Sequence, residues 1–278
     1  MCKISWVVIL KVNIIYLTLI SFFPMVMSGC SLSTPMDVGD GIFQKLEVGD
    51  SFTHRVLVKP GSGEILHIYI EGDGLAWLSR TRVSSDPSPK NPLMFSLMKL
   101  DSAPAVYIGR PCYFMQGNEL DIEYPECSPY WWTFGRYSEK VLSSMAVVVA
   151  KESENYKQIV LIGHSGGGTL ATLLAKRNDK IKAVVTAAAN LNLSEWAAHH
   201  QYTYLYGSLD PTLFLVLPND IVQLHYLGDA DSEIKEGWQK KYLARHPNAS
   251  LIILPGVTHQ QGWDTHWPAI LRDLSSQL

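Results

Sequence analysis

The sequence predicts an α/β protein with a mostly parallel central sheet and helices on both faces of that sheet. Seven short apolar runs have the length of strands, at 52–59, 64–72, 104–111, 157–163, 182–189, 221–228 and 249–256. Several of them are almost continuously apolar, as strands buried on both faces are. Helix-like segments lie among them, at 136–154, 167–177, 232–245 and 266–278. Alternating strands and helices are typical of a parallel sheet covered by helices.

Length and composition predict one large domain, which we place at residues 51–278. The chain has 278 residues, of which 47% are apolar, so it can bury a substantial core. The formal net charge is −3 and no basic stripe is present, which argues against a nucleic-acid partner. Residues 30–50 are expected to form a linker and a first edge element.

The first 29 residues have the composition of an export signal. Lys3 and Lys11 are followed by a long apolar run without an acidic residue. The run ends in Met27-Ser28-Gly29-Cys30, which resembles a bacterial lipobox, where Cys30 would become the lipidated first residue of the mature protein. The alternative is an uncleaved N-terminal membrane anchor. Both place the rest of the chain on a membrane of the cell envelope, and Ser31 after the cysteine implies the outer membrane in a Gram-negative cell.

Two further cysteines agree with export. Cys112 and Cys127 flank a segment rich in proline, glycine and aromatic residues. In an oxidising compartment such a pair is expected to form a disulfide. Two buried free thiols are the alternative. A metal site is not expected, because no histidine or cysteine partners have zinc-like spacing.

One turn in the sequence gives the strongest indication of a catalytic residue. The strand-like run 157–163 leads into Gly163-His164-Ser165-Gly166-Gly167, and a helix-like run follows at once. A sharp strand-to-helix turn strains the serine backbone and leaves no room for neighbouring side chains. The serine hydroxyl is then exposed at the carboxyl edge of the sheet, above a helix N-terminus that favours negative charge. This Gly-x-Ser-x-Gly context is that of a nucleophile elbow, with Ser165 as the nucleophile.

A serine nucleophile needs a base, and the base needs an orienting acid. Asp229 and Asp231 follow the strand-like run 221–228, and His259 follows the run 249–256. All three lie just past the carboxyl end of a strand, at the sheet edge where Ser165 is expected. The residues alone leave Asp229 and Asp231 open as the acid.

From about residue 51 to 278, the chain resembles an α/β-hydrolase, and more narrowly the exported, lipobox-bearing bacterial members. The family's Gly-x-x-Asp pattern runs from Gly228 to Asp231, so the resemblance implies Asp231 as the acid, with Asp229 as the alternative. A Gly-x-x-His pattern, from Gly256, likewise implies His259 as the base.

Three other histidines are less suited to be the base. His266 falls within the predicted last helix, and His225 lies inside a strand, as a core histidine would. His164 adjoins the nucleophile, where the family's histidine usually serves packing.

The resemblance also implies an oxyanion hole. One donor is expected to be the backbone N–H of Gly166, and the other the N–H of Asp73 or Gly74. The family often has His-Gly-x-Gly where this chain has Glu71-Gly72-Asp73-Gly74. A plain glycine turn is the alternative for this loop.

Two segments are expected to wall the site, 75–103 and the possible cap 190–220. Their aromatic residues either line an acyl pocket or form the core of the cap: Trp77, Trp196, Tyr202, Tyr204 and Tyr206. His199 and His200 are not expected to bind metal, because adjacent helical residues point apart.

The sequence therefore predicts a membrane-anchored serine hydrolase that cleaves a small-molecule ester, or less favourably an amide, through an acyl-enzyme. No cofactor or metal is implied. An acyltransferase with the same three residues is one alternative. A non-catalytic binding protein on a hydrolase fold is another, and the complete set Ser165, Asp231 and His259 argues against it.

Overall fold

The computed structural model describes residues 36–39, 41–115 and 124–278. The predicted export signal, its lipobox and Cys30 lie outside the described residues. Among the described helices, none combines the length and the apolar character that a membrane crossing requires.

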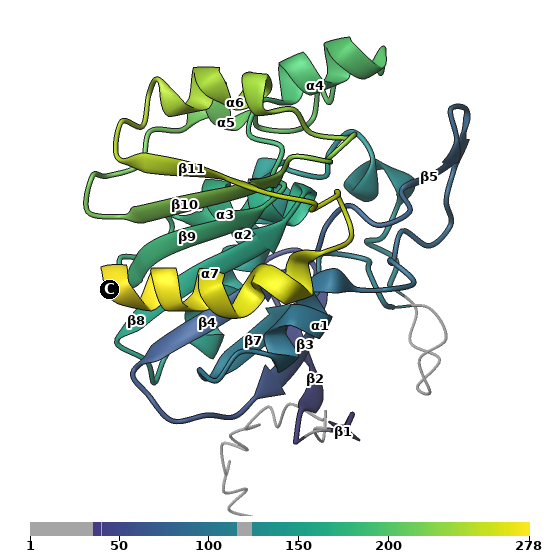
Figure 1. Cartoon of the computed structure of the whole chain (residues 1–278). Coiled ribbons are helices and arrows are strands. Elements are labelled where there is room, and N and C mark those ends of the chain that lie inside the picture. Colours follow the sequence, from purple (N-terminus) through teal and green to yellow (C-terminus); the bar gives the residue numbers. More distant parts are fainter. Residues whose placement is uncertain (1–35, 40, 116–123) are drawn as a thin grey trace, which may run out of the picture. The chain divides into compact units, whose positions relative to one another are not determined.

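The described residues form one main sheet. Its strands are β1 (Met36–Asp37), β2 (Phe43–Val48), β3 (Thr53–Lys59), β4 (Ile65–Ile70), β7 (Ala105–Ile108), β8 (Gln158–His164), β9 (Ile181–Ala187), β10 (Val222–Gly228) and β11 (Ala249–Leu254). Their order across the sheet is β1-β2-β3-β7-β4-β8-β9-β10-β11 (Figure 1). The strands from β7 to β11 in this order are parallel, whereas β1, β2 and β3 pair antiparallel at one edge. A separate hairpin joins β5 (Trp77–Ser79) to β6 (Arg82–Val83).

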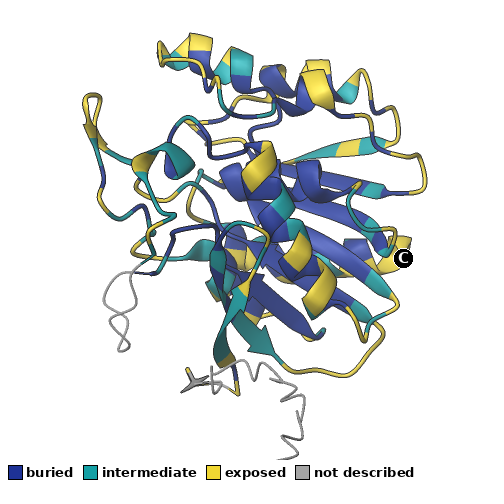
Figure 2. Ribbon diagram, turned by 180° about the vertical axis from the view of Figure 1, so that it is seen from behind, coloured by how far each residue is buried: buried dark blue, intermediate teal, exposed yellow. Residues whose placement is uncertain are grey.

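Helices cover both faces of the sheet. They are α1 (Leu93–Lys99), α2 (Glu139–Glu152), α3 (Gly166–Leu174), α4 (Leu193–His200), α5 (Pro211–Phe214), α6 (Glu236–Leu243) and α7 (Trp263–Gln277), with a 3-10 turn at Pro129–Trp132. Apolar residues of α2 and α3 pack on one face, and those of α1 and α7 pack on the other. The central strands are therefore buried on both sides, while the outer surfaces of α2 and α7 are exposed (Figure 2). Burial on both faces explains why these strands are almost continuously apolar in sequence.

The predicted fold class is confirmed. All seven predicted strands are present, with ends that differ by a few residues, and so are the four predicted helices. The last helix begins at Trp263 rather than at His266, because Gly262 has a left-handed backbone (φ 89°) that ends the preceding loop. Residues 30–50 contain the edge strands β1 and β2, segment 75–103 contains the hairpin and α1, and segment 190–220 contains α4 and α5.

The predicted disulfide is present in the structure. Cys112 and Cys127 are bonded and lie 15 positions apart in the sequence. Cys112 follows β7 by four residues, so the bond restrains the loop that leaves the carboxyl end of this strand.

Reduction of this disulfide should destabilise the protein. A crosslink across a loop of this length lowers the entropy of the unfolded chain and contributes about 3 kcal/mol. We expect the urea midpoint of the wild type, followed by circular dichroism, to fall when dithiothreitol is added. The double variant Cys112→Ala/Cys127→Ala is the control, since its midpoint should be low already and insensitive to the reductant. Equal midpoints for the oxidised and reduced wild type would contradict this prediction.

Candidate functional site

Ser165 occupies a strained turn between β8 and α3. Its backbone has φ 50° and ψ −121°, a conformation that residues with side chains rarely adopt. The glycines around it permit a very close approach of chain segments. A Cβ atom on Gly163 would lie 2.3 Å from the carbonyl oxygen of Gly167, and one on Gly167 would lie 2.2 Å from that of Ile70. These close contacts explain why glycine is needed at positions 163 and 167, as the sequence indicated.

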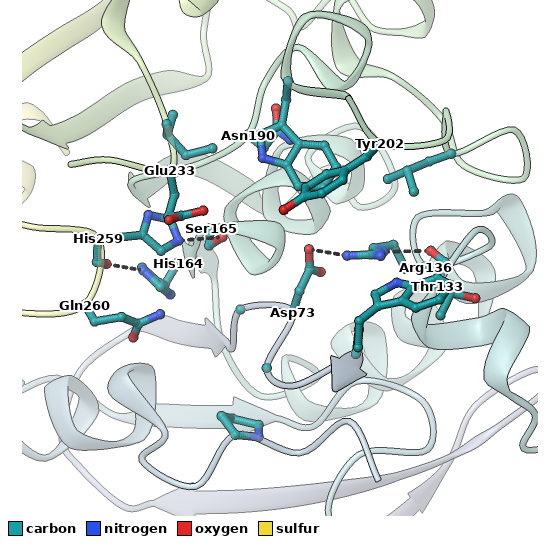
Figure 3. A pocket seen from close by; sticks show the side chains of 18 of the residues that line it. Asp73, Thr133, Arg136, His164, Ser165, Asn190, Tyr202, Glu233, His259 and Gln260 are labelled. Atoms are coloured by element: carbon teal, nitrogen blue, oxygen red, sulfur yellow. Dashed lines mark hydrogen bonds and ion pairs between the residues drawn. The ribbon is translucent and has the colours of Figure 1, made fainter. Parts of the chain in front are cut away.

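Ser165, His259 and Asp231 form a continuous hydrogen-bonded chain (Figure 3 shows the serine and histidine). Ser165 Oγ lies 3.1 Å from His259 Nε2, and Asp231 Oδ2 lies 2.9 Å from His259 Nδ1. The three residues come from the loops after β8, β10 and β11, which end at the same edge of the sheet. The structure therefore brings together three side chains that are far apart in sequence.

Asp231, and not Asp229, contacts the histidine. The Asp231 carboxylate is buried and also accepts the N–H groups of Glu233 (2.7 Å) and Ile234 (3.0 Å). Burial raises the pKa of this carboxyl, but His259 and the two N–H groups outweigh burial and lower it. The Asp229 carboxylate instead accepts the N–H of Gly256 at 2.8 Å, on the exposed surface.

His164 supports the loop that carries His259. Its Nε2 donates to the carbonyl oxygen of His259 at 2.7 Å, and the indole N–H of Trp263 reaches the same oxygen at 3.2 Å. Burial, followed by the nearby His259, lowers the pKa of His164 to about 3. His164 is thus a neutral donor that restrains the loop, a role more specific than packing.

The other histidines lie elsewhere. His225 is buried in β10 against Thr186 Oγ1 at 2.8 Å, and His266 lies in α7. His54 forms a second serine–histidine pair, with its Nε2 2.8 Å from Ser144 Oγ, but both side chains are fully buried. No substrate can reach that serine in this fold.

The predicted oxyanion donors have unused N–H groups. Within the described part of the chain, the backbone N–H groups of Gly166, Asp73 and Gly74 donate to no protein acceptor. Asp73 and Gly74 line the same cavity as Ser165, and Gly166 begins the first turn of α3. These groups are therefore available to a ligand.

Two buried arginines hold the half-buried Asp73 side chain in an ionic cluster, which sequence reasoning did not anticipate. Asp73 Oδ1 accepts from Arg110 Nη1 (2.5 Å), and Oδ2 accepts from Arg136 Nη1 (2.8 Å) and the Tyr137 hydroxyl (2.6 Å). The Tyr113 hydroxyl donates to the carbonyl oxygen of Asp73 at 2.9 Å. A Cβ atom on Gly166 would lie 2.1 Å from Asp73 Oδ1, so the carboxylate packs directly against the start of α3.

Glu71 occupies the position where α/β-hydrolases often have a histidine. Its carboxylate is buried and accepts the N–H groups of Gly72 (3.2 Å) and Met94 (3.0 Å), so it caps the N-terminus of α1. Burial raises the pKa of Glu71 to about 7 in spite of these hydrogen bonds. Glu71 therefore joins the end of β4 to α1 and is not placed to act as a base for Ser165.

Ser165 and His259 line a cavity of about 1110 Å³ (Figure 3). Both expected wall segments contribute to it, with Trp77 and Arg80 from 75–103 and with Trp196 and Tyr202 from 190–220. Among the five aromatic residues singled out in the sequence, Tyr204 and Tyr206 do not line the cavity, and Tyr206 stacks on Phe134 at 4.8 Å. His199 and His200 pack on aromatic rings. In the described residues no three histidine, cysteine or acidic side chains are grouped so that they could hold a metal ion.

The fold agrees with comparisons to known proteins. A family model described as the alpha/beta hydrolase fold matches residues 122–247. The chain has the α/β-hydrolase fold. A search of curated proteins finds no match, but many solved structures share the fold.

Three solved structures illustrate the likeness. The Pyrococcus furiosus esterase Pf2001 is 13% identical with a TM-score of 0.57, covering 84% of this chain and 89% of the esterase. A cold-adapted esterase from an Arctic intertidal metagenomic library is 11% identical with a TM-score of 0.59, covering 88% and 97%. XC6422 from Xanthomonas campestris, a serine hydrolase without a lid, is 13% identical with a TM-score of 0.51, covering 84% and 93%. At these identities the likeness concerns the α/β-hydrolase fold.

Replacing Asp73 by asparagine should destabilise the protein strongly. The variant keeps the side-chain shape but leaves two buried guanidinium groups without their counter-charge, which typically costs about 3–5 kcal/mol. Although burial raises the pKa of Asp73, Arg136 and Arg110 lower it further, so the net shift is downward. The stabilisation is then complete above the unfolded pKa of about 3.9 and is lost as the pH falls through the lower folded value.

Urea unfolding at pH 7 measures this loss of stability. In acid, the free energies of unfolding of the wild type and of Asp73→Asn should converge. Asp86→Asn is the matched control, because the Asp86 carboxylate accepts the N–H of Ser88 and should contribute about 1 kcal/mol or less. Asp73→Asn with wild-type stability at pH 7 would refute the ionic role of the cluster.

Proposed function

We propose that this protein hydrolyses esters through an acyl-enzyme formed on Ser165. The observation that carries the proposal is the hydrogen-bonded chain from Ser165 through His259 to the buried carboxylate of Asp231. A nucleophile, a base within hydrogen-bond reach and an acid that orients the base are the three parts that this chemistry requires. Two of the structurally similar proteins are esterases, which favours esters as the first substrates to test.

In the first half of the reaction, Ser165 Oγ attacks the carbonyl carbon while His259 Nε2 takes the hydroxyl proton. The carbonyl electron pair moves onto its oxygen and gives a tetrahedral intermediate. When that intermediate collapses, the bond to the alcohol oxygen breaks, and His259 returns the proton to the departing alkoxide. The alcohol leaves, and the acyl group remains as an ester of Ser165.

In the second half, water repeats these steps. His259 takes a proton from the water as its oxygen attacks the acyl carbon, and then gives a proton to Ser165 Oγ as the acid departs. Asp231 accepts the Nδ1–H of His259 throughout, which keeps Nε2 free to act as a base and stabilises the imidazolium. The hydrogen bonds from Glu233 and Ile234 support this role, because they hold the carboxylate in place.

The oxyanion of each intermediate is received by the N–H of Gly166 and the N–H of Asp73 or Gly74. These N–H groups have no protein acceptor in the described residues. They belong to two segments that approach each other very closely, the start of α3 and the loop after β4. The loss of one such donor typically costs about 3 kcal/mol in the transition state.

Export and lipid anchoring belong to the same proposal. The lipobox-like sequence at Cys30 supports them. The Cys112–Cys127 disulfide agrees with an oxidising compartment, where such bonds persist. The protein would then act on small esters from a membrane of the cell envelope.

Turnover of a short p-nitrophenyl ester distinguishes Asp231 from Asp229. An acid that orients a catalytic histidine contributes about four orders of magnitude to turnover in the serine protease case. We expect Asp231→Asn to lose activity on that scale, and Asp229→Asn to remain within a few-fold of the wild type because its carboxylate only joins two strand ends.

Ser165→Ala supplies the background rate, and circular dichroism confirms folding of each variant. An inactive Asp229→Asn beside an active Asp231→Asn would move the acid by two residues. If added alcohols are acylated faster than water, the protein is an acyltransferase; if every variant including Ser165→Ala matches the wild type, the proposal fails.

A further inference from the structure

The ionic cluster around Asp73 carries an uncompensated positive charge. Two guanidinium groups, Arg110 and Arg136, contact one carboxylate, and both arginines are at most 5% exposed. The Tyr137 hydroxyl is the third partner of that carboxylate and brings no charge. A buried charge is costly unless something pairs with it, so an excess charge at a site points to a ligand of opposite sign.

The excess charge faces the cavity through Arg136. Arg136 lines the cavity, whereas Arg110 does not. Arg136 uses Nη1 for Asp73 and Nε for the carbonyl oxygen of Thr133, and its Nη2 has no hydrogen-bond partner in the described residues. Arg110 Nη2 is fully buried and has no partner, whereas Arg136 Nη2 is not among the fully buried atoms that lack a partner, so it keeps some exposure. One guanidinium donor is therefore available to a group inside the cavity.

The other charges that line the cavity are unevenly placed. Arg80, from the β5–β6 hairpin, adds a second cation. Glu233 lies near His259, on the other side of Ser165 from Asp73 and Arg136 (Figure 3). Glu71 also lines the cavity, but its carboxylate is hydrogen-bonded to the start of α1.

The mechanism assigns the two sides of Ser165 to different parts of the substrate. The departing alcohol oxygen must take its proton from His259 Nε2, so the alcohol lies on the side of His259. The acyl group would then extend to the other side of Ser165, which is the side where Asp73 and Arg136 lie (Figure 3). Trp77 and Phe134 wall the cavity there, with their rings in edge-to-face contact at 6.1 Å.

We propose that the preferred substrates are esters whose acyl group ends in a carboxylate, which pairs with Arg136 and is attracted by Arg80. This inference rests on the proposed ester hydrolysis and names the substrate class of that site. A guanidinium presents its donors in a plane that matches a carboxylate, and such charge-assisted hydrogen bonds are the stronger ones. The aromatic walls would hold the methylene groups between the two ends of the acyl chain.

Matched substrates test this directly. The p-nitrophenyl monoesters of succinic, glutaric and adipic acid place a carboxylate at three distances from the reacting carbonyl. Their counterparts with a terminal –CONH₂ have the same shape without the charge. For at least one chain length we expect kcat/KM for the acid to exceed that for the amide by about tenfold to a hundredfold. Ser165→Ala supplies the blank for spontaneous and carboxylate-assisted hydrolysis.

Three arginine variants locate the effect. Arg136→Gln should abolish the preference for the acid, and the amide counterpart reports any general loss of activity caused by disturbing Asp73. Arg80→Gln should reduce the preference by a few-fold, because Arg80 is exposed and its charge is screened. Arg82→Gln is the matched control, since Arg82 is on the same hairpin but does not line the cavity, and it should retain the wild-type preference.

The outcomes separate this inference from the proposed function. Equal kcat/KM values for acid and amide at every length would overturn it and leave ester hydrolysis intact. So would an equal fall for both substrates in Arg136→Gln, since the cluster would then serve only the oxyanion. Failure to cleave either series while Ser165 still reacts with a fluorophosphonate would also overturn it. If Ser165 is unreactive as well, the proposed function fails.

Discussion

The close approach between the end of β4 and the first turn of α3 is the constraint on which the site depends. Side chains at Gly166 or Gly167 would collide with Asp73 or with the carbonyl oxygens of Ile70 and Glu71. Because no Cβ atoms intervene, the helix begins directly against the strand end, and Ser165 is forced into its left-handed backbone. The same contact brings the unused N–H groups of Gly166 and Asp73 to the edge of the sheet where Ser165 stands.

Residues from other parts of the chain stabilise this contact. Arg110 and Tyr113 come from the loop after β7, which the Cys112–Cys127 bond restrains, and Arg136 and Tyr137 come from the segment before α2. All four contact Asp73, so two separate parts of the chain fix one residue of the candidate oxyanion hole. Buried charges are expensive to maintain, and a cluster with one charge in excess is difficult to explain by stability alone. This is the physical reason to connect it with an anionic substrate.

Features that depend on neighbouring residues were predictable from the sequence. The strand, the glycine turn and the helix around Ser165 lie within twenty residues, and the steric need for glycine is local. The positions of His259 and Asp231 follow from a rule of topology, because parallel strands end at one edge. The choice of Asp231 over Asp229 came only from the family's spacing. The physical basis of this choice is that the Asp229 carboxylate accepts the N–H of Gly256, where β10 and β11 end.

Features that need distant partners were missed. Nothing local to Asp73 indicates that Arg110 and Arg136 will contact it, although an arginine two residues after the end of the apolar strand β7 was a signal. Glu71 was recognised as a departure from the family pattern, but its role depends on α1, which was not predicted. His164 was assigned to packing, because its hydrogen bond crosses to a loop 95 residues away.

The claim that Ser165 is a nucleophile activated by His259 is tested most directly by covalent labelling. The protein is treated with a fluorophosphonate, and peptide mass spectrometry then locates the adduct. The account predicts one adduct, on Ser165, and a labelling rate that falls by about three orders of magnitude or more in His259→Ala. Ser144, which is hydrogen-bonded to His54 but fully buried, is an internal control and should stay unlabelled. An unmodified Ser165 under conditions that label a known serine hydrolase, or labelling that is unchanged in His259→Ala, would contradict the account.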